Sequence, residues 1–397
     1  MNILLISRCP PYPLHFGDRL IVYHLARELS QRGHVIDLLA FSNRVEDLAE
    51  RGEYAAFFRS VTLVPEPPRP LIDYARRVLK LRPRFASTPD QAWSPEMARL
   101  IREKRTQNHY DLAHLFGGVH VYEYAPLVGD LPALITPYES YALYLRRQLE
   151  NASSLRARLS SWLMMRLARA FESFMFDPYC AAVVVSPLDR DELMTINPAL
   201  NVQVIPNGID LDSFPFGTDE RDPRRLLFTG NFEYAPNVDA AKRLITQILP
   251  QVQARIPDVS LWIVGNAPPP DLQALASDRV IVTGRVPDLS AYLRGAAVYI
   301  AALRLGAGIK NKVLEALASG IPVIGTPVSM DGIAVTDGEN ALIAATDAQI
   351  AAAAIRLLEN AALRDQIGAA GRRLIESRYT WSAAAAAYEE LYKTCAS

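Results

Sequence analysis

The segment 303–312 combines residue types that bind anions. Gly306 and Gly308 carry no side chain, so their backbone amides can approach a ligand closely. A helix is expected to begin near Lys312, and a helix start offers unpaired N–H groups and the positive end of the helix dipole. Lys310 and Lys312 add two cations at the same place. The segment therefore predicts a cradle for a pyrophosphate group.

Glu315 follows one turn into the expected helix. A carboxylate there can accept hydrogen bonds from vicinal hydroxyls such as those of a ribose. Its neighbours in 313–317 are otherwise apolar, and a carboxylate in apolar surroundings needs partners. The alternative interpretation is structural: a glycine-rich turn enters a helix, and Glu315 lies on a solvated helix face.

Short apolar runs alternate with helix-length amphipathic segments along the chain. A strand–helix–strand order predicts right-handed crossovers and a parallel sheet, with ligands beyond the carboxyl ends of the strands. The order starts again in the second half, so the fold class is α/β with two successive doubly wound units. Strands are expected at 2–7, 35–41, 111–116, 181–186, 225–229, 260–264, 280–283, 298–302 and 322–325, and helices near 19–32, 237–249, 312–319 and after 381.

The chain has 397 residues, which exceeds the size at which a single core keeps growing. Proline, asparagine, glycine and aspartate cluster in 206–222, which is typical of a linker. The expected domains are therefore 1–205 and 223–379, joined by the linker 206–222. A C-terminal helix, 380–397, is expected to pack back on the first domain.

The balance of 42 lysines and arginines against 43 aspartates and glutamates gives no reason to expect nucleic acid as a partner. Cys9, Cys180 and Cys395 have no metal-ligand spacing, so neither a structural zinc nor a disulfide framework is expected. The N-terminus lacks a signal-peptide pattern, and no apolar run reaches membrane-spanning length. A cytoplasmic protein is expected, with any membrane contact peripheral, at the inner face.

Five segments together resemble a known family. The stretch 312–326 is similar to the donor-site segment of retaining GT-B glycosyltransferases in the GT4 family. The others follow in the family's order: its opening at 2–35, its interdomain segment at 204–210, the start of its second domain at 227–230, and the stretch that meets the nucleotide base at 282–286.

The resemblance implies the GT-B architecture, which is two Rossmann-like domains with an interdomain cleft. It implies a retaining glycosyltransferase that moves a sugar from a nucleotide-diphosphate sugar, foremost a UDP- or GDP-sugar, to an acceptor. The acceptor is a glycan, a lipid-linked molecule or a small molecule, and neither a metal nor another cofactor is expected. The joint occurrence of the segments 234–240 and 308–312 makes the sequence most similar to PEP-CTERM/exopolysaccharide-associated sugar transferases. This resemblance implies a role in polysaccharide biosynthesis.

By this resemblance Glu315 is the second glutamate of the family's E-x7-E pair and binds the donor ribose. The first glutamate, which holds the transferred sugar, falls at Ala307, so backbone amides nearby are expected to take over. Asn231 replaces the family's arginine, so Lys310, with Lys312, is expected to stabilise the leaving pyrophosphate as the catalytic cation. The predicted nucleotide-sugar site comprises Gly17, Asp18, Gly230, Asn231, Arg285, Val286, Gly306, Gly308, Ile309, Lys310, Asn311, Lys312, Val313 and Glu315.

The first domain offers fewer candidates. His114 ends an apolar strand that resembles the family's D-x-x-H-x-H strand end, and it is either catalytic or a hydrogen-bonded core histidine. Asp18 after Gly17 either faces the sugar or acceptor or is a helix N-cap. Tyr138 and Glu139 are the candidates for acceptor contacts.

Two further segments have two interpretations each. Asn237 follows a proline and precedes a helix, which indicates an N-cap or a ligand contact. The helix expected at 155–176 carries Arg156, Arg158, Arg166 and Arg169 beside apolar residues. It is either a surface for anionic lipid or an ordinary helix packed on the sheet with a solvated arginine edge.

Two other functions remain open. A nucleotide-sugar epimerase of the same fold needs an acid/base pair, and no acidic residue occurs between Asp288 and Glu315. A catalytically inactive GT-B scaffold or binding protein is favoured by Ala307. The retained Lys310 and Glu315 argue against it, because an inactive site has little reason to keep an anion cradle.

Overall fold

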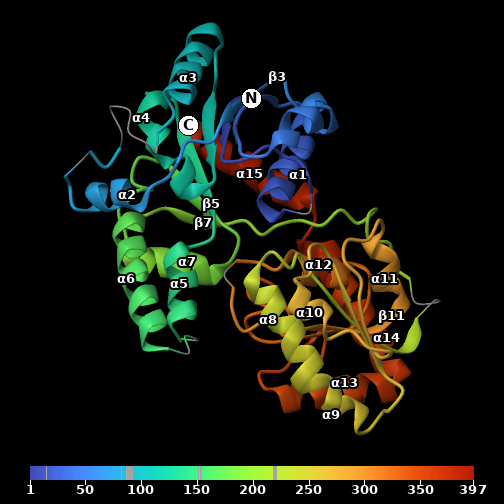
Figure 1. Cartoon of the computed structure of the whole chain (residues 1–397). Coiled ribbons are helices and arrows are strands. Elements are labelled where there is room, and N and C mark those ends of the chain that lie inside the picture. The colour runs from blue at the N-terminus through green and yellow to red at the C-terminus, as the bar shows by residue number, and fades with distance from the viewer. Residues whose placement is uncertain are drawn as a thin grey trace. The chain divides into compact units, whose positions relative to one another are not determined.

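The computed structural model of the chain describes residues 1–14, 16–81, 83–85, 93–150, 152, 154–217, 221–306 and 308–397. They form two compact units, one of Met1–Pro206 with Trp381–Ser397 and one of Asn207–Thr380 (Figure 1). Each unit contains a parallel sheet whose strands are joined through helices. The predicted fold class, α/β with two doubly wound units, is confirmed.

The first unit holds a seven-stranded sheet in the order β3-β2-β1-β4-β5-β6-β7. Its strands are β1 (Asn2–Ser7), β2 (Val35–Ser42), β3 (Ser60–Pro65), β4 (Leu112–Phe116), β5 (Ala133–Tyr138), β6 (Ala181–Val184) and β7 (Val202–Val204). Its helices are α1 (Gly17–Gln31), α2 (Leu71–Val78), α3 (Pro95–Gln107), α4 (Ala125–Val128), α5 (Tyr141–Glu150), α6 (Leu155–Glu172), α7 (Pro187–Ile196) and α15 (Trp381–Ala396), with short 3-10 turns η1 (Val45–Glu53), η2 (Ala55–Phe57), η3 (Gly118–His120) and η4 (Tyr122–Tyr124).

The central strand β1 buries both of its faces. Leu4 and Ile6 join the apolar cluster on one side of the sheet, whereas Ile3 and Leu5 join the cluster that α1 and α15 cover on the other. Such double burial explains why the strand is an uninterrupted apolar run in the sequence.

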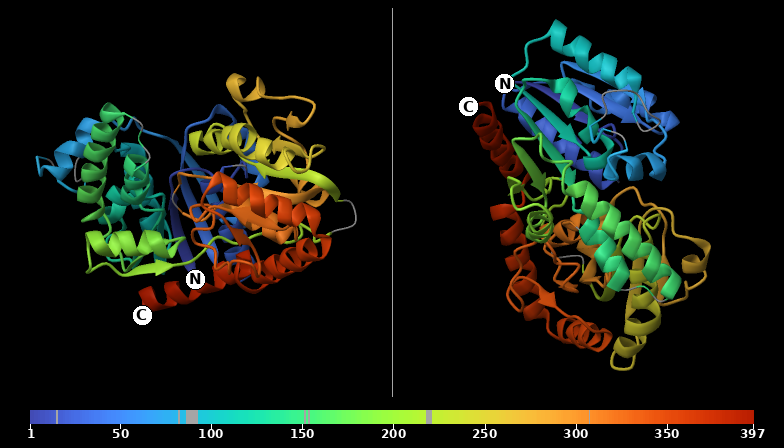
Figure 2. Two further views of the ribbon diagram at one scale, coloured as in Figure 1. Left: turned by 90° about the horizontal axis from the view of Figure 1, so that it is seen from below. Right: turned by 90° about the vertical axis from the view of Figure 1, so that its left-hand side faces the viewer.

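The C-terminal helix α15 packs on α1, and the two chain ends lie side by side (Figures 1 and 2). Its first residue, Trp381, stacks on the ring of His24 with centroids 4.9 Å apart. A disulfide joins Cys180, just before β6, to Cys395 in this helix. This corrects the expectation that the chain has no disulfide framework: the two cysteines are 215 residues apart, and only the return of α15 brings them together.

The second unit holds a six-stranded sheet in the order β10-β9-β8-β11-β12-β13. Its strands are β8 (Asp222–Thr229), β9 (Ser260–Val264), β10 (Val280–Val282), β11 (Ala296–Ala301), β12 (Val323–Gly325) and β13 (Leu342–Ile343). Its helices are α8 (Ala235–Arg243), the π-helical turn η5 (Leu244–Ile248), α9 (Leu249–Gln253), α10 (Pro270–Gln273), α11 (Leu289–Gly295), α12 (Asn311–Ala318), α13 (Asp347–Glu359) and α14 (Ala361–Arg378).

The predicted strands are all present, with ends shifted by a few residues at most. The helix predicted at 237–249 begins two residues earlier, at Ala235, and continues through η5 into α9. The pattern did not reveal β3, β5, β7 or β13. β7 and β13 are edge strands of three and two residues and carry little periodic signal, and β3 and β5 each contain a proline, which argues against a strand.

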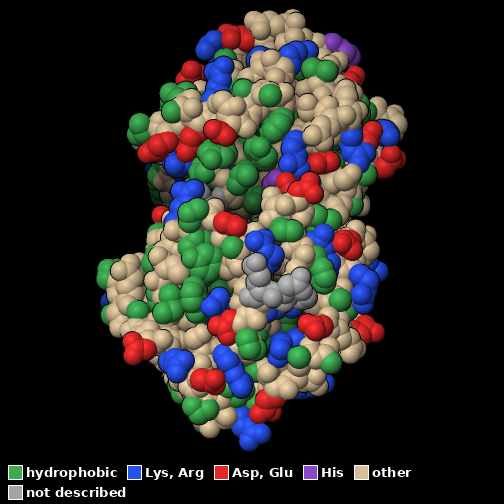
Figure 3. Space-filling model, turned by 90° about the vertical axis from the view of Figure 1, so that its right-hand side faces the viewer, with side chains coloured by type: hydrophobic (Ala, Val, Ile, Leu, Met, Phe, Trp, Pro, Cys, Tyr) green, Lys and Arg blue, Asp and Glu red, His purple; other side chains and the backbone are tan. Residues whose placement is uncertain are grey.

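The surface mixes charges of both signs. On the face shown in Figure 3, lysine and arginine side chains stand among aspartates and glutamates. Among the described helices, none combines the length and the apolar character that a bilayer-spanning segment requires.

Candidate active site

The candidate site lies where the strand order of the second sheet reverses. β9 and β10 lie on one side of β8, and β11, β12 and β13 lie on the other. The loops after β8 and β11 therefore lead away in opposite directions, and ligands of open α/β sheets bind at the carboxyl ends of the strands at such a point. Gly230 and Asn231 follow β8, and the glycine-rich loop follows β11, so the fold brings two predicted segments together.

The glycine-rich loop leads directly into the start of α12. Lys310 is the N-cap residue, with extended backbone, and its carbonyl accepts the amide of Val313 at 2.8 Å. Gly306 and Gly308 have φ of 140° and 64°, which favour glycine. The first amides of α12 have no partner within the helix and can donate to an anion. Ala307, where the family's first glutamate would stand, lies outside the described residues.

The two lysines of this segment have different positions. The Lys310 ammonium is buried and donates to the carbonyl of Gly308, so it braces the glycine loop. The Lys312 ammonium donates to Oδ1 of Asn237 and lies 5.2 Å from the ring centroid of Phe228 near the end of β8. Lys312 therefore bridges the two sides of the point where the strand order reverses.

Lys312 and Glu315 are desolvated charges of opposite sign. Burial lowers the pKa of Lys312 to about 7, with Lys310 adding to the shift and Glu315 opposing it. Burial raises the pKa of Glu315 to about 7, against the attraction of Lys312. Strongly shifted pKa values at the start of a helix beside the carboxyl edge of a sheet are typical of a functional site. An incoming diphosphate would hold Lys312 in its charged form.

The structure corrects the prediction that Asn237 is an N-cap. Tyr234 is the N-cap residue of α8, and Asn237 lies within the first turn. Its Nδ2 donates to the carbonyl of Asn231 at 2.7 Å, and its Oδ1 accepts from Lys312. A Cβ on Gly230 would lie 3.0 Å from this Nδ2, so the glycine lets α8 approach the β8 loop. Asn237 therefore positions Lys312.

The loops after β9 and β10 extend this edge. A Cβ on Gly265, after β9, would lie 1.8 Å from the carbonyl oxygen of Gly230, so the two loops touch only because Gly265 lacks a side chain. Arg285 and Val286 follow β10, where Arg285 is exposed and Val286 is half-buried. They follow the edge strand β10, which is two strands away from β8 in the sheet.

Three predicted residues around the start of α12 support the loop from within. Ile309 and Val313 are buried, so their side chains pack under the loop and only their backbone faces a ligand. The Oδ1 of Asn311 accepts from Nδ2 of Asn207 at 2.8 Å. Sequence reasoning missed Asn207, although it stands in the segment 204–210 that carried the family resemblance.

The first sheet has the same reversal of strand order, between β1 and β4. Arg8 follows β1, and its Nε lies 3.3 Å from Oδ2 of Asp18. Gly117 follows β4, where a Cβ would lie 2.5 Å from Cβ of Arg8, so the glycine makes room for the arginine. Sequence reasoning missed Arg8, because a single arginine after a strand carries no distinctive spacing.

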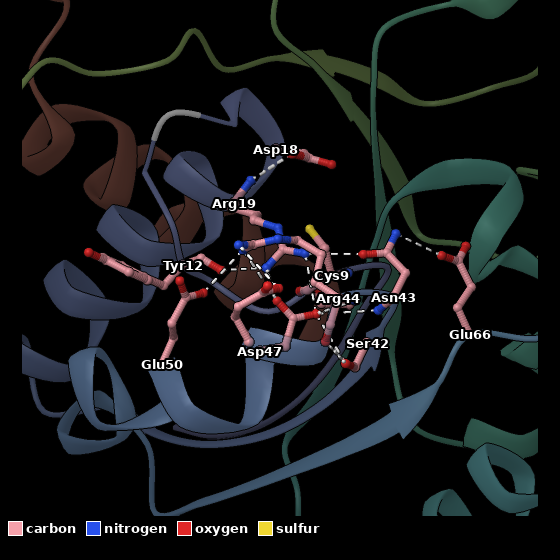
Figure 4. A network of polar contacts seen from close by, with 12 residues as sticks. Cys9, Tyr12, Asp18, Arg19, Ser42, Asn43, Arg44, Asp47, Glu50 and Glu66 are labelled. Atoms are coloured by element: carbon pink, nitrogen blue, oxygen red, sulfur yellow. Dashed lines mark hydrogen bonds and ion pairs between the residues drawn. The ribbon is translucent and has the colours of Figure 1, made fainter. Parts of the chain in front are cut away.

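The start of α1 differs from the N-cap interpretation of Asp18. Phe16 is the N-cap residue, Gly17 is the first helical residue, and Asp18 lies in the first turn. The next residue, Arg19, is buried and donates to Oδ1 of Asp47 at 2.6 Å (Figure 4). This buried ion pair anchors the start of α1, so the Arg8–Asp18 pair stands on a fixed backbone.

Tyr138 ends β5 at the same edge of the first sheet. Its φ is 74°, which is uncommon outside glycine. Its ring meets that of Phe116 with centroids 4.7 Å apart, and within the described part of the chain its buried hydroxyl has no hydrogen-bond partner. Strained backbone and an unsatisfied buried hydroxyl cluster at functional sites, so Tyr138 remains an acceptor candidate. Glu139 beside it is half-buried.

Two buried carboxylates hold the segment after Tyr138. Glu172 accepts the hydroxyl of Ser140 at 3.0 Å, and Asp189 accepts its amide at 2.8 Å. Burial raises the pKa of Glu172 to about 8, against the hydrogen bonds it accepts. Sequence reasoning missed both residues, since each lies on a helix remote in sequence from Tyr138.

His114 is fully buried in β4. Its Nδ1 lies 2.8 Å from the hydroxyl of Tyr392 in α15, and its Nε2 lies 2.8 Å from Oγ1 of Thr136. Burial lowers the pKa of His114 to about 3, so the imidazole is neutral near pH 7. The structure therefore supports the core-histidine interpretation and not the catalytic one.

Two family models match the chain. One, described as Glycosyltransferase Family 4, matches residues 20–213, and the other, described as Glycosyl transferases group 1, matches residues 223–360. The chain belongs to glycosyltransferase family 4. The first match covers most of the first unit, and the second lies within the second unit and includes the Lys312 site.

Individual relatives agree with this membership. A phosphatidyl-myo-inositol mannosyltransferase of Mycobacterium tuberculosis is 31% identical over 207 residues, which are 48% of this chain and 54% of the relative. The chain thus spans about half the length of that curated relative.

Solved structures show the shared fold. Sucrose-phosphate synthase of Thermosynechococcus elongatus aligns with a TM-score of 0.71 and 20% identity, over 99% of this chain and 98% of the other. The Anabaena protein HepE in complex with UDP aligns with a TM-score of 0.71 and 13% identity, over 99% and 100%. The fold is that of the GT-B glycosyltransferases.

Proposed function

We propose that this member of glycosyltransferase family 4 transfers a sugar from a nucleoside-diphosphate sugar to an acceptor hydroxyl. One observation carries the proposal. At the point of the second sheet where the strand order reverses, Lys312 and Glu315 lie at the start of α12, with pKa values shifted toward each other. The lysine can bind a diphosphate and the glutamate can accept hydrogen bonds from a ribose, and both lie directly after a glycine-rich loop.

The proposed roles follow from the positions of the groups. The first amides of α12 and the Lys312 ammonium donate to the diphosphate, and Glu315 accepts the ribose hydroxyls. Lys310, whose ammonium is held by the carbonyl of Gly308, keeps the loop in shape and adds positive charge. The earlier assignment of the main cationic role to Lys310 is therefore replaced by Lys312.

During transfer, the bond between the anomeric carbon and the diphosphate oxygen breaks, and the acceptor oxygen bonds to that carbon. The acceptor proton leaves with the departing diphosphate. Negative charge grows on the diphosphate, and preorganised donors aimed at such charge are each worth about 10²- to 10³-fold in rate. We propose retention of the anomeric configuration and no metal requirement, supported by family membership and by two cations at the site.

The finer identity of the substrates is also a proposal. UDP- or GDP-sugars are the proposed donors, and the UDP complex of the structurally similar HepE supports UDP first. A lipid-linked or glycan acceptor is supported by the phosphatidyl-myo-inositol mannosyltransferase. We propose the link to PEP-CTERM/exopolysaccharide-associated transferases from the sequence of two loops. We propose a cytoplasmic location because nucleotide sugars are expected to be supplied there.

A panel of UDP, GDP, ADP, TDP and their sugars, followed by thermal unfolding, tests the proposal. A ligand at about 100 times its dissociation constant should stabilise the fold by about 2.7 kcal/mol. We expect one base to stabilise the wild type, and Lys312→Met and Glu315→Gln to weaken the effect. Lys242→Met is the matched control, because Lys242 pairs with Asp271 on the surface of the same unit. No response to any nucleotide would refute the proposal.

The inactive-scaffold alternative keeps one argument, which is the alanine at position 307 where the family has a glutamate. It predicts nucleotide binding without turnover. Release of free nucleoside diphosphate from the stabilising sugar nucleotide, in the presence of candidate acceptors, separates the two functions.

A further inference from the structure

α6 carries an exposed apolar stripe in addition to its buried face. Leu155, Leu159, Trp162 and Leu163 expose 85%, 67%, 46% and 61% of their surfaces. Their spacing of i, i+4, i+7 and i+8 places all four on one side of a helix. The right-hand view of Figure 2 faces the hairpin formed by α5 and α6 (green).

The opposite side of α6 packs against α5 within the first unit. Ala168 packs with Ala142 and Leu145 of α5, and Ser161 is buried beside the same helix. The hydroxyl of Ser154 accepts the amide of Ala157 and caps the helix. The exposed stripe is therefore not required to hold α6 in place, and leaving it in water has a cost that a partner would remove.

The charges around the stripe have one sign. No acidic residue occurs from 155 to 171, and Arg156 and Arg158 flank the stripe on its two sides by helical spacing. The guanidinium of Arg166 lies over the ring of Trp162, 5.9 Å from its centroid. Among the described residues, these three arginines form no ion pair with a carboxylate, whereas Arg169 on the packed side pairs with Glu192 at 2.5 Å.

We propose that α6 is a docking surface for an anionic lipid bilayer, with the helix lying in the plane of the interface. An apolar stripe with a tryptophan, bordered by arginines that pair with no carboxylate of the described residues, matches the acyl boundary and the phosphate layer of such a membrane. The proposal goes beyond sugar transfer and uses no residue of the Lys312 site, so either can fail without the other.

The test is flotation of the full chain with vesicles of phosphatidylcholine alone and of phosphatidylcholine mixed with phosphatidylglycerol. We expect binding to the mixed vesicles only. Trp162 is the most exposed of the described tryptophans, so its emission should shift to the blue and be quenched by lipids brominated in the acyl chains. Trp162→Phe should remove most of that signal and keep most of the binding.

Two double variants separate the apolar and the charged contributions. Leu159→Ser with Leu163→Ser should weaken vesicle binding by about tenfold or more. Arg156→Gln with Arg158→Gln should weaken it by about 25-fold, since each arginine near an anionic surface contributes about fivefold. Leu48→Ser is the control: Leu48 is 69% exposed, but it lies in the acidic turn η1. All of these positions are on the surface, so the variants should fold.

Absence of wild-type binding to anionic vesicles overturns the proposal, as does equal binding of the arginine variant. If light scattering shows a wild-type dimer that Leu159→Ser with Leu163→Ser converts to a monomer, while vesicles do not bind, the stripe is instead an interface between two copies of the chain.

Discussion

The two sheets reverse their strand order in the same way, and at each reversal point a cation stands near a carboxylate. In the second unit the two are Lys312 and Glu315, both desolvated, with pKa values near 7. In the first unit they are Arg8 and Asp18, an ion pair whose side chains keep 35% and 26% exposure. The strand order determines where a site lies, and the loops determine what it binds.

The difference has a physical cause. In the second unit the glycine-rich loop and the start of α12 bring unpaired amides and a buried lysine to one place, which suits a compact dianion. In the first unit the corresponding place holds a paired arginine and the unsatisfied hydroxyl of Tyr138, which suits hydroxyl groups of an acceptor.

Lys312→Met should remove most nucleoside-diphosphate binding. A half-buried charge that is expected to meet the diphosphate is lost, at a cost of about 2–4 kcal/mol, or about 10²-fold in the dissociation constant. Arg8→Gln should leave that constant unchanged. Isothermal titration of both variants measures the contrast, and equal losses would mean that the two units share the donor.

His114→Leu should lower stability and leave nucleotide binding intact. It leaves the buried hydroxyl of Tyr392 without its histidine partner, while Thr136 keeps the hydroxyl of Tyr388, and the loss costs about 1–3 kcal/mol of unfolding free energy. Denaturant unfolding gives the stability, and titration gives the binding. A catalytic His114 would show the reverse: unchanged stability with lost turnover.

Glu315→Gln should weaken binding of the nucleoside diphosphate by about tenfold, through the loss of a charged hydrogen-bond acceptor for the ribose. It should not weaken the binding of inorganic pyrophosphate, because that ligand has no ribose. Competition between the two ligands in a titration gives both constants. Equal weakening of both would place Glu315 at the phosphates.

Raising the pH through 7 should weaken diphosphate binding through Lys312. The folded pKa of Lys312, about 7, lies below the ordinary value of 10.5, so this group favours folding more as the pH rises from 7 to 10.5. Ligand binding has the opposite sign, because the protonated ammonium is the form that binds the anion. Above pH 7, a plot of the logarithm of the dissociation constant against pH should approach a slope of one, which corresponds to one proton taken up on binding.

Lys312→Met is the control for this pH profile. The ligand's own titration affects wild type and variant alike, so the difference between the two profiles isolates the lysine. A variant that keeps the full slope would assign the titration to another group.

Much of the fold and part of the site could be predicted from the sequence. The alternation of apolar runs and helices gives both doubly wound units, and the glycines with Lys312 and Glu315 mark the donor loop. Contacts between distant segments could not be predicted: Lys312 meets Asn237 from 75 residues away, and His114 meets Tyr392 from 278. The Cys180–Cys395 disulfide was missed for the same reason. The N-cap positions of α1 and α8 are taken by Phe16 and Tyr234, which are uncommon residue types at a cap, so residue preference pointed to Asp18 and Asn237 instead.

A crystal structure with the nucleoside diphosphate that stabilises the chain would show whether the start of α12 is the donor site. We predict the diphosphate within hydrogen-bond distance of the first amides of α12 and of the Lys312 ammonium, with the ribose hydroxyls on Glu315. A nucleotide bound elsewhere, or bound here with Lys312 still on Asn237 and no contact to phosphate, would contradict the account.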